Sequence, residues 1–104
     1  MDGTYVGTST RFRADSRACP SPGRVTLRVL DGVSSYRFAR QPVPLTVAAD
    51  GSVTGSLPIS SALGDVTFTG HADNGQIIAD VTTAECSYHV TTKLHEPPPP
   101  RPPG

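Results

Sequence analysis

Residues 23–40 read GRVTLRVLDGVSSYRFAR, and this stretch decides the fold class. Apolar and polar residues alternate on both sides of Asp31-Gly32. Alternation at every second residue is typical of a half-buried β-strand, and Asp-Gly between two such runs indicates a tight hairpin turn. The stretch therefore predicts two strands, 23–30 and 33–40, each with one buried side and one side facing solvent.

The same pattern continues along the chain, and turn signals such as Asp50-Gly51 and Asp73-Asn74-Gly75 interrupt it. No segment shows the apolar period of a helix. Pro42-Val43-Pro44 is expected to break a strand, because proline cannot donate to a ladder. We predict an all-β antiparallel meander of seven to eight strands, since 44–49 could also continue 33–40 past a proline bend. The expected strands are 4–13, 23–30, 33–40, 44–49, 52–59, 65–71, 76–82 and 86–95.

Cys19 and Cys86 are the two cysteines of the chain, and we predict that they form a disulfide. Apolar residues are 36% of the chain, below the usual share, so a small core benefits from a covalent link. Closing a loop of about 68 residues stabilises the fold by about 4 kcal/mol in the chain-entropy model. The alternative is a pair of separate buried thiols.

The predicted disulfide also constrains the topology. Cys19 lies just after the first expected strand, and Cys86 opens the last one. The Cα atoms of a disulfide lie roughly 4.4–6.8 Å apart, so the end of the first strand is expected beside the start of the last. Pairing of first and last strands favours a small closed or nearly closed barrel, with a β-sandwich as the alternative.

The cysteines favour an exported protein, because disulfides persist in oxidising compartments. No apolar run is long enough for a transmembrane segment. No signal peptide opens the sequence, so an exported protein would begin here after its cleavage point, with Met1 an added residue. We expect one β-domain at 1–95 and a proline-rich tail or linker at 96–104, which favours extended polyproline II.

Charge is unevenly distributed although the formal net charge is zero. Residues 1–40 carry a net charge of +4 and residues 41–96 a net charge of −5. If Val6 and Phe12 point inward on the first strand, alternation places five arginines on one outer surface. We predict this surface as a candidate anion-binding face, because guanidinium groups pair well with carboxylate, phosphate or sulfate. Its members are Arg11, Arg13, Arg24, Arg28 and Arg37.

The expected partner is an anionic glycan, a lipid headgroup or a protein. Nucleic acid is the least favoured partner, because the chain lacks high overall basicity and aromatic stacking platforms. The alternative interpretation is a solvated charged face that keeps the protein soluble.

Catalysis has little support in the sequence. Nucleophile-elbow, metalloprotease and phosphate-loop motifs are absent. His89 and His95 are six residues apart on one strand, too far to share a metal ion, and His71 reaches them only through strand pairing. We therefore predict a non-catalytic protein with no metal and no cofactor.

Four functional interpretations remain open. An exported binding module, expected to be a monomer, would use the arginine face. A small-ligand carrier would need an internal cavity, and an inhibitor-like barrel would need a protruding ordered loop, for which 14–22 is the candidate. A purely structural spacer would need neither.

Short motifs give one resemblance. Asp2-Gly3-Thr4-Tyr5-Val6-Gly7, Asp50-Gly51-Ser52-Val53-Thr54-Gly55 and Cys86-Ser87-Tyr88 resemble small exported β-domains of uncharacterised bacterial proteins. The resemblance implies a periplasmic or surface location in bacteria, and it implies no activity.

Overall fold

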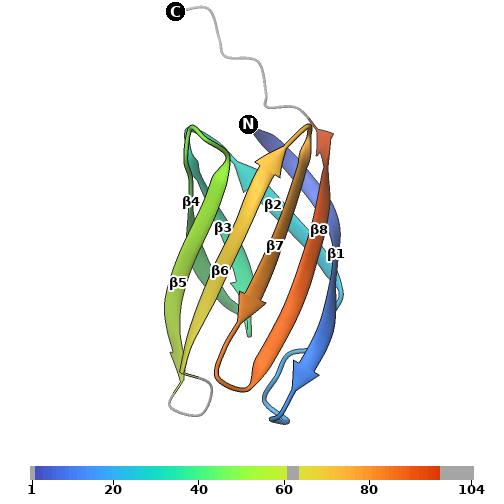
Figure 1. Cartoon of the computed structure of the whole chain (residues 1–104), viewed down its shortest axis with the longest axis vertical. Helices are drawn as coiled ribbons and strands as arrows, with labels where there is room; N and C mark the ends of the chain where they lie inside the picture. The colour runs from blue at the N-terminus through green and yellow to red at the C-terminus, as the bar shows by residue number, and fades with distance from the viewer. Residues whose placement is uncertain (1, 61–63, 97–104) are drawn as a thin grey trace, which may run out of the picture.

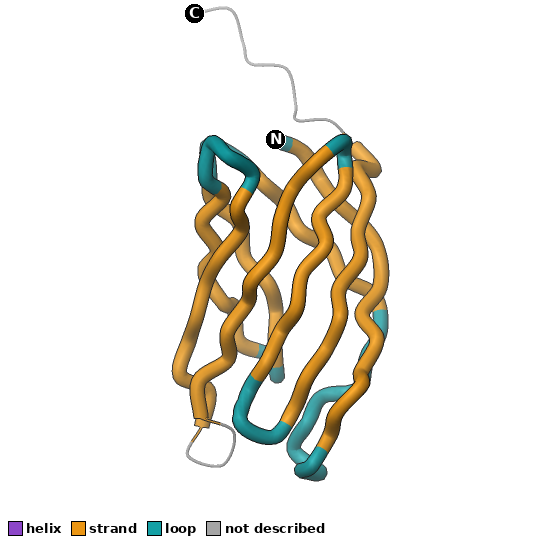
Figure 2. The backbone as a smooth tube through the Cα atoms, in the orientation of Figure 1, coloured by secondary structure: helices purple, strands orange, loops and turns teal. Residues whose placement is uncertain are grey.

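The computed structural model describes residues 2–60 and 64–96, and it is an all-β, nearly closed barrel (Figure 1). All strand pairs are antiparallel, and they form one sheet in the order β2-β1-β8-β7-β6-β5-β4-β3. The described residues contain no helix, and so none that could cross a membrane (Figure 2). The strands are β1 (Gly3–Ala14), β2 (Arg24–Val29), β3 (Val33–Phe38), β4 (Gln41–Val47), β5 (Ser52–Ser60), β6 (Gly64–Asp73), β7 (Gln76–Thr82) and β8 (Cys86–Glu96).

The predicted pairing of first and last strands is confirmed. β1 pairs with β8 from Thr4↔Glu96 to Ala14↔Cys86, and the two strands lie side by side in Figure 1. The Cys19–Cys86 disulfide is present, with Cα atoms 5.7 Å apart. It ties the loop after β1 to the start of β8 at one end of the barrel.

The core is built from alternate residues of every strand. Leu27, Val43, Val66, Phe68 and Val90 have no exposed surface. Two aromatic pairs link distant strands, Tyr36 with Phe68 at 5.4 Å and Phe38 with Tyr88 at 5.7 Å between ring centres. Burial of these apolar side chains is the main force that holds the sheet in its curled form.

The predicted orientation of the first strand is wrong. Tyr5 and Ser9 face the interior and are at least nine-tenths buried, whereas Phe12 is 66% exposed. Val6 faces outward, opposite Thr26 and Lys93 on the neighbouring strands. The strand has few apolar residues, so its alternation is a weak indicator of which side is buried. Its pairing with β8 is also irregular between Arg11 and Arg13, and counting alternate residues back from Phe12 therefore assigned the wrong side of β1 to the interior.

The strands β3 and β4 are separate, so the alternative of one bent strand is wrong. A two-residue turn joins them, and both its central residues, Ala39 and Arg40, have positive φ (50° and 66°). Pro42 and Pro44 lie inside β4 instead of breaking it. Their ring nitrogens point toward β5, where the described ladder is limited to Thr46↔Thr54 and Val47↔Val53.

The structure describes only part of the predicted C-terminal region. The strands extend through Glu96, close to the predicted domain boundary at 95. The proline-rich segment 97–104 lies outside the described residues.

Candidate functional site

The two free edges of the sheet are β2 and β3, although these strands follow each other in sequence. They meet at the Asp31-Gly32 turn, where Leu30 and Val33 exchange backbone hydrogen bonds of 3.0 and 3.1 Å. Within the described residues the pairing of β2 with β3 ends at this bridge. We call the gap between Arg24–Val29 and Val33–Phe38 the seam.

Backbone alternation determines which groups face the seam. The Ser9 N–H donates to the Gly23 carbonyl at 2.8 Å, which identifies residues 25, 27 and 29 as the β2 residues bonded to β1. The intervening residues direct their N–H and C=O groups the other way, as Leu30 does toward Val33. By the same rule, β3 bonds to β4 through residues 34, 36 and 38. The seam-facing backbone groups therefore belong to Arg24, Thr26, Arg28, Ser35 and Arg37.

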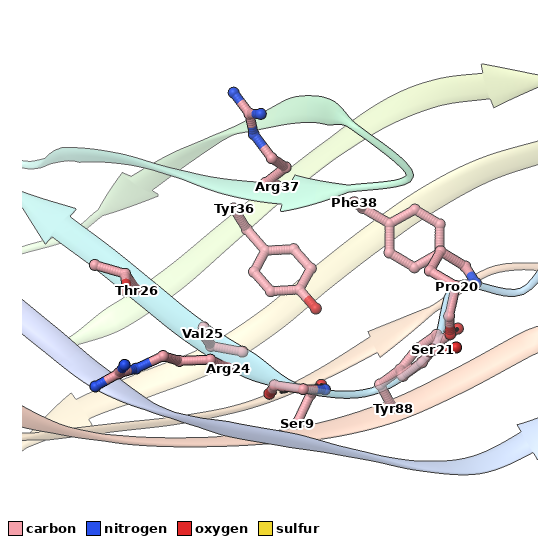
Figure 3. Close-up of a pocket in the computed structure, with 11 residues that line it drawn as sticks. Ser9, Pro20, Ser21, Arg24, Val25, Thr26, Tyr36, Arg37, Phe38 and Tyr88 are labelled. Carbon is pink, nitrogen blue, oxygen red and sulfur yellow. Dashed lines mark hydrogen bonds between the residues drawn. The ribbon is translucent and has the colours of Figure 1, made fainter.

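A pocket of about 150 Å³ lies at the wide end of the seam (Figure 3). Arg24 and Thr26 of β2 and Arg37 of β3 line its outer part. Tyr36, Phe38 and Tyr88 line its inner part. In Figure 3, Tyr36 extends from β3 toward β2, while Arg37 extends from the opposite side of β3. The pocket thus has an aromatic floor and a cationic rim.

The two tyrosine hydroxyls in the pocket have different environments. The Tyr88 hydroxyl donates a hydrogen bond to the Pro20 carbonyl. The Tyr36 hydroxyl has no hydrogen-bond partner within residues 2–60 and 64–96. Burial, reinforced by the nearby Tyr88 phenol, raises the pKa of Tyr36 to about 12. Tyr36 is therefore a neutral phenol at neutral pH and can donate a hydrogen bond to an acceptor in the pocket.

Two of the five predicted arginines are occupied by contacts within the protein. Arg11 donates to the Cys19 and Pro20 carbonyls, both at 3.4 Å. Arg13 pairs with Asp15 at 3.1 Å and donates to the Thr83 and Ala84 carbonyls and to Ser87 Oγ. These contacts fasten the end of β1 to the β7–β8 turn and to the disulfide loop, so both side chains have a structural role.

The other three arginines remain on the outer surface beside the seam. Arg24, Arg28 and Arg37 are exposed, and they make no hydrogen bond or ion pair with another residue of the described chain. The sequences of β2 and β3, RVTLRV and VSSYRF, contain no acidic residue. Of the five predicted residues, Arg24 and Arg37 thus line the pocket. Arg28 lies farther along β2, outside the pocket lining, and Arg11 and Arg13 lie elsewhere.

The histidines do not form a cluster. His89 pairs with Asp80 at 3.0 Å on the exposed face of β7 and β8. His71 is separated from His89 by β7, because its partner there is Ile78. Residues 2–60 and 64–96 contain no group of three or more His, Cys, Asp or Glu side chains that could hold a metal ion.

The loop 14–22 is ordered by the disulfide and by a turn. The Cys19 N–H donates to the Ser16 carbonyl at 3.2 Å, and the Ala18 N–H donates to Ser16 Oγ at 3.1 Å. Arg17 is exposed at the tip of this turn. The turn covers residues 16–19, and the disulfide fixes the loop at Cys19.

The comparisons with known proteins give no match, whether to family models, to curated proteins or to solved structures.

Sequence analysis missed several residues of this site. Thr26, Ser35 and Tyr36 are not among the predicted site residues, because Asp31-Gly32 predicts that its flanking strands pair with each other. The available signal was the charge of the two strands, which carry Arg24, Arg28 and Arg37 on their exposed faces and contain no acidic residue.

Proposed function

We propose that this protein is a non-catalytic binding module that contacts an anionic partner at the seam. The observation that carries the proposal is the pair Arg24 and Arg37, exposed and unpaired in the described chain at the rim of a pocket between two free sheet edges. Arg28 is exposed and unpaired on the same face of β2, outside the pocket lining. Such groups attract and orient carboxylate, phosphate or sulfate, and partners with these groups include acidic glycans, lipid headgroups and acidic proteins.

The pocket adds features that a plain charged surface lacks. The Tyr36 phenol can donate a hydrogen bond, and Phe38 and Tyr88 provide apolar contact beneath the rim. An anionic group at the rim would also relieve the repulsion between like charges. These features favour a site with defined geometry over a surface that only keeps the protein soluble.

The disulfide is typical of proteins in oxidising, extracellular-type environments. We extend this to a bacterial periplasmic or surface location, which the resemblance of the short motifs also implies. An acidic polymer or headgroup of the cell envelope is the kind of partner available there.

Binding to immobilised heparin and to vesicles of an anionic phospholipid tests the proposal at low and at physiological salt. We expect the double variant Arg24→Ala/Arg37→Ala to bind at least tenfold more weakly than the parent. The matched control is Arg17→Ala/Lys93→Ala, which removes the same charge from exposed positions outside the pocket. An equal loss of affinity in both variants would mean that binding depends on net charge alone, which would contradict a defined site. Unchanged binding in Arg24→Ala/Arg37→Ala would also contradict the proposal.

A further inference from the structure

The seam exposes backbone groups as well as arginine side chains. Arg24, Thr26 and Arg28 direct their N–H and C=O groups toward β3, and Ser35 and Arg37 direct theirs toward β2. Free edges of this kind are templates for pairing with another extended chain. Small barrels normally remove such edges by closing, so two facing edges with unpaired backbone are a specific feature of this fold.

The seam-facing backbone and the arginine side chains belong to the same residues. Each seam-facing residue of β2 and β3 has its side chain on the outer surface of the sheet. An extended peptide that pairs with these residues would place alternate side chains beside them on that outer surface. Its other side chains would point inward, over Tyr36 and Phe38. The geometry thus specifies acidic residues at alternate positions with apolar or small residues between them.

We infer that the partner bound at the seam is a short, extended acidic peptide segment that adds as a β-strand. This inference rests on the proposed function and names its ligand class. The peptide enters at the wide end, where the pocket of about 150 Å³ lies, and pairs along Arg24 and Thr26 or along Arg37. The Leu30–Val33 bridge holds the other end of the seam at one strand spacing, which limits the paired length to a few residues.

Main-chain hydrogen bonds and charge pairs can be separated by substitution. Thr26→Pro removes one seam-facing N–H from β2, and Thr26→Ala keeps that N–H while removing the same side chain. Proline is tolerated on an edge strand where its missing N–H faces outward, so the β1–β2 ladder is expected to remain. Ser35→Pro with Ser35→Ala gives the same comparison on β3, and it serves if Thr26→Pro fails to fold.

The probe is a seven-residue peptide with glutamate at positions two, four and six and valine or threonine at the others. A second peptide has the same sequence with N-methyl groups on all of its internal amides, which removes the N–H donors of both strand edges and keeps the charge. Heparin is the anionic probe without a peptide backbone. Affinity is measured by titration calorimetry, with amide hydrogen exchange of β2 and β3 as the structural measurement.

We expect the acidic peptide to bind and to slow exchange of the Thr26 or Arg37 amide. Proline at position 26 or 35 is expected to weaken peptide binding about tenfold relative to the matching alanine, with heparin binding unchanged. Arg24→Ala/Arg37→Ala is expected to weaken binding of both probes.

Different failures overturn different statements. If both proline variants fold and bind the peptide as their alanine partners do, or if the N-methylated peptide binds equally well, strand addition is wrong and the anionic site stands. If heparin binds and the peptide does not, the ligand class is wrong. If Arg24→Ala/Arg37→Ala binds both probes like the parent, the proposed function and the strand-addition inference are both wrong.

Discussion

Leu30 and Val33 exchange two backbone hydrogen bonds across the Asp31-Gly32 turn, and the described ladder between β2 and β3 ends at this pair. A hairpin normally continues from such a pair into two bonded strands. Here the strands diverge, and each obtains its bonds from its other neighbour, β1 or β4. The barrel is therefore joined by the β1–β8 ladder and is open between β2 and β3 beyond the Leu30–Val33 pair, with the arginines on the two strands that border this opening.

The β3–β4 turn is expected to be a site of avoidable strain. Ala39 and Arg40 both have positive φ, which non-glycine residues adopt at a cost of roughly 1–2 kcal/mol each. Replacing the pair with Asn-Gly, the preferred sequence for such turns, is expected to raise the free energy of unfolding by about 1 kcal/mol. The converse change, Asn74→Ala in the β6–β7 turn where Asn74 has φ of 51°, is expected to lower it. Urea unfolding of both variants measures this, and equal stabilities would contradict the turn assignment.

Gly7 is expected to be essential for pairing of the first and last strands. A Cβ atom at Gly7 would lie 1.9 Å from the Thr91 carbonyl oxygen, and backbone cannot move aside as a side chain can. We expect Gly7→Ala to lower the free energy of unfolding by about 3 kcal/mol or to prevent folding. Gly23→Ala is the matched control, because a Cβ there meets no atom within 4 Å. A stable Gly7→Ala protein with unchanged disulfide would show that β1 and β8 are not packed as described.

The two pocket tyrosines are expected to respond differently to loss of their hydroxyls. Tyr88→Phe removes the bond to the Pro20 carbonyl and is expected to lower the free energy of unfolding by about 1 kcal/mol at pH 7. Tyr36→Phe is expected to change it by less than about 0.5 kcal/mol, since its hydroxyl has no partner within the described chain. A larger loss in Tyr36→Phe than in Tyr88→Phe would contradict the pocket geometry.

The raised pKa of Tyr36 predicts a specific alkaline destabilisation. The pKa of this phenol is about 12 in the folded protein and about 10 in the unfolded chain, so the unfolded state loses its proton first as pH rises. Ionisation of Tyr36 does not affect the free energy of unfolding below pH 10. This free energy then falls by on the order of 2 kcal/mol between pH 10 and pH 12. Unfolding curves at pH 9 and pH 12 measure the fall, which should be smaller in Tyr36→Phe. An identical fall in that variant would show that Tyr36 is not buried in this way.

The disulfide is expected to supply a large part of the stability. It joins residues 67 positions apart, and the chain-entropy model assigns such a closure about 4 kcal/mol. The double variant Cys19→Ala/Cys86→Ala is expected to lose about this much in urea unfolding. The parent protein without reductant should take up no thiol label when denatured, and two labelled thiols would contradict the bond.

The sequence alone was sufficient for most of the architecture. Its turn signals and alternation located all eight strands to within a few residues, because each strand has one buried and one wet face. The spacing of Cys19 and Cys86 correctly placed β1 beside β8. The orientation of β1 was predicted wrongly because Phe12, which served as an inward marker, lies in the irregular part of the strand.

The candidate site was less accessible to sequence reasoning. Arg24, Arg28 and Arg37 were identified from strand alternation alone, which holds wherever the strands lie. Arg11 and Arg13 were assigned to the same face, but their contacts are with the disulfide loop and the β7–β8 turn, which only three-dimensional structure reveals. Asp31-Gly32 indicates a hairpin whose two strands pair with each other. The gap between β2 and β3 is the opposite arrangement, so the sequence pattern did not predict the seam.

Amide hydrogen exchange of the unliganded protein tests the seam most directly. The amides of Arg24, Thr26, Arg28, Ser35 and Arg37 face the seam unpaired, whereas residues 25, 27, 36 and 38 are bonded to β1 or β4. We predict fast and slow exchange in strict alternation along β2 and β3, with protection rising only at the Leu30–Val33 bridge. Uniform protection along both strands would mean that β2 and β3 pair and the barrel is closed, which would remove both the pocket and the free edges.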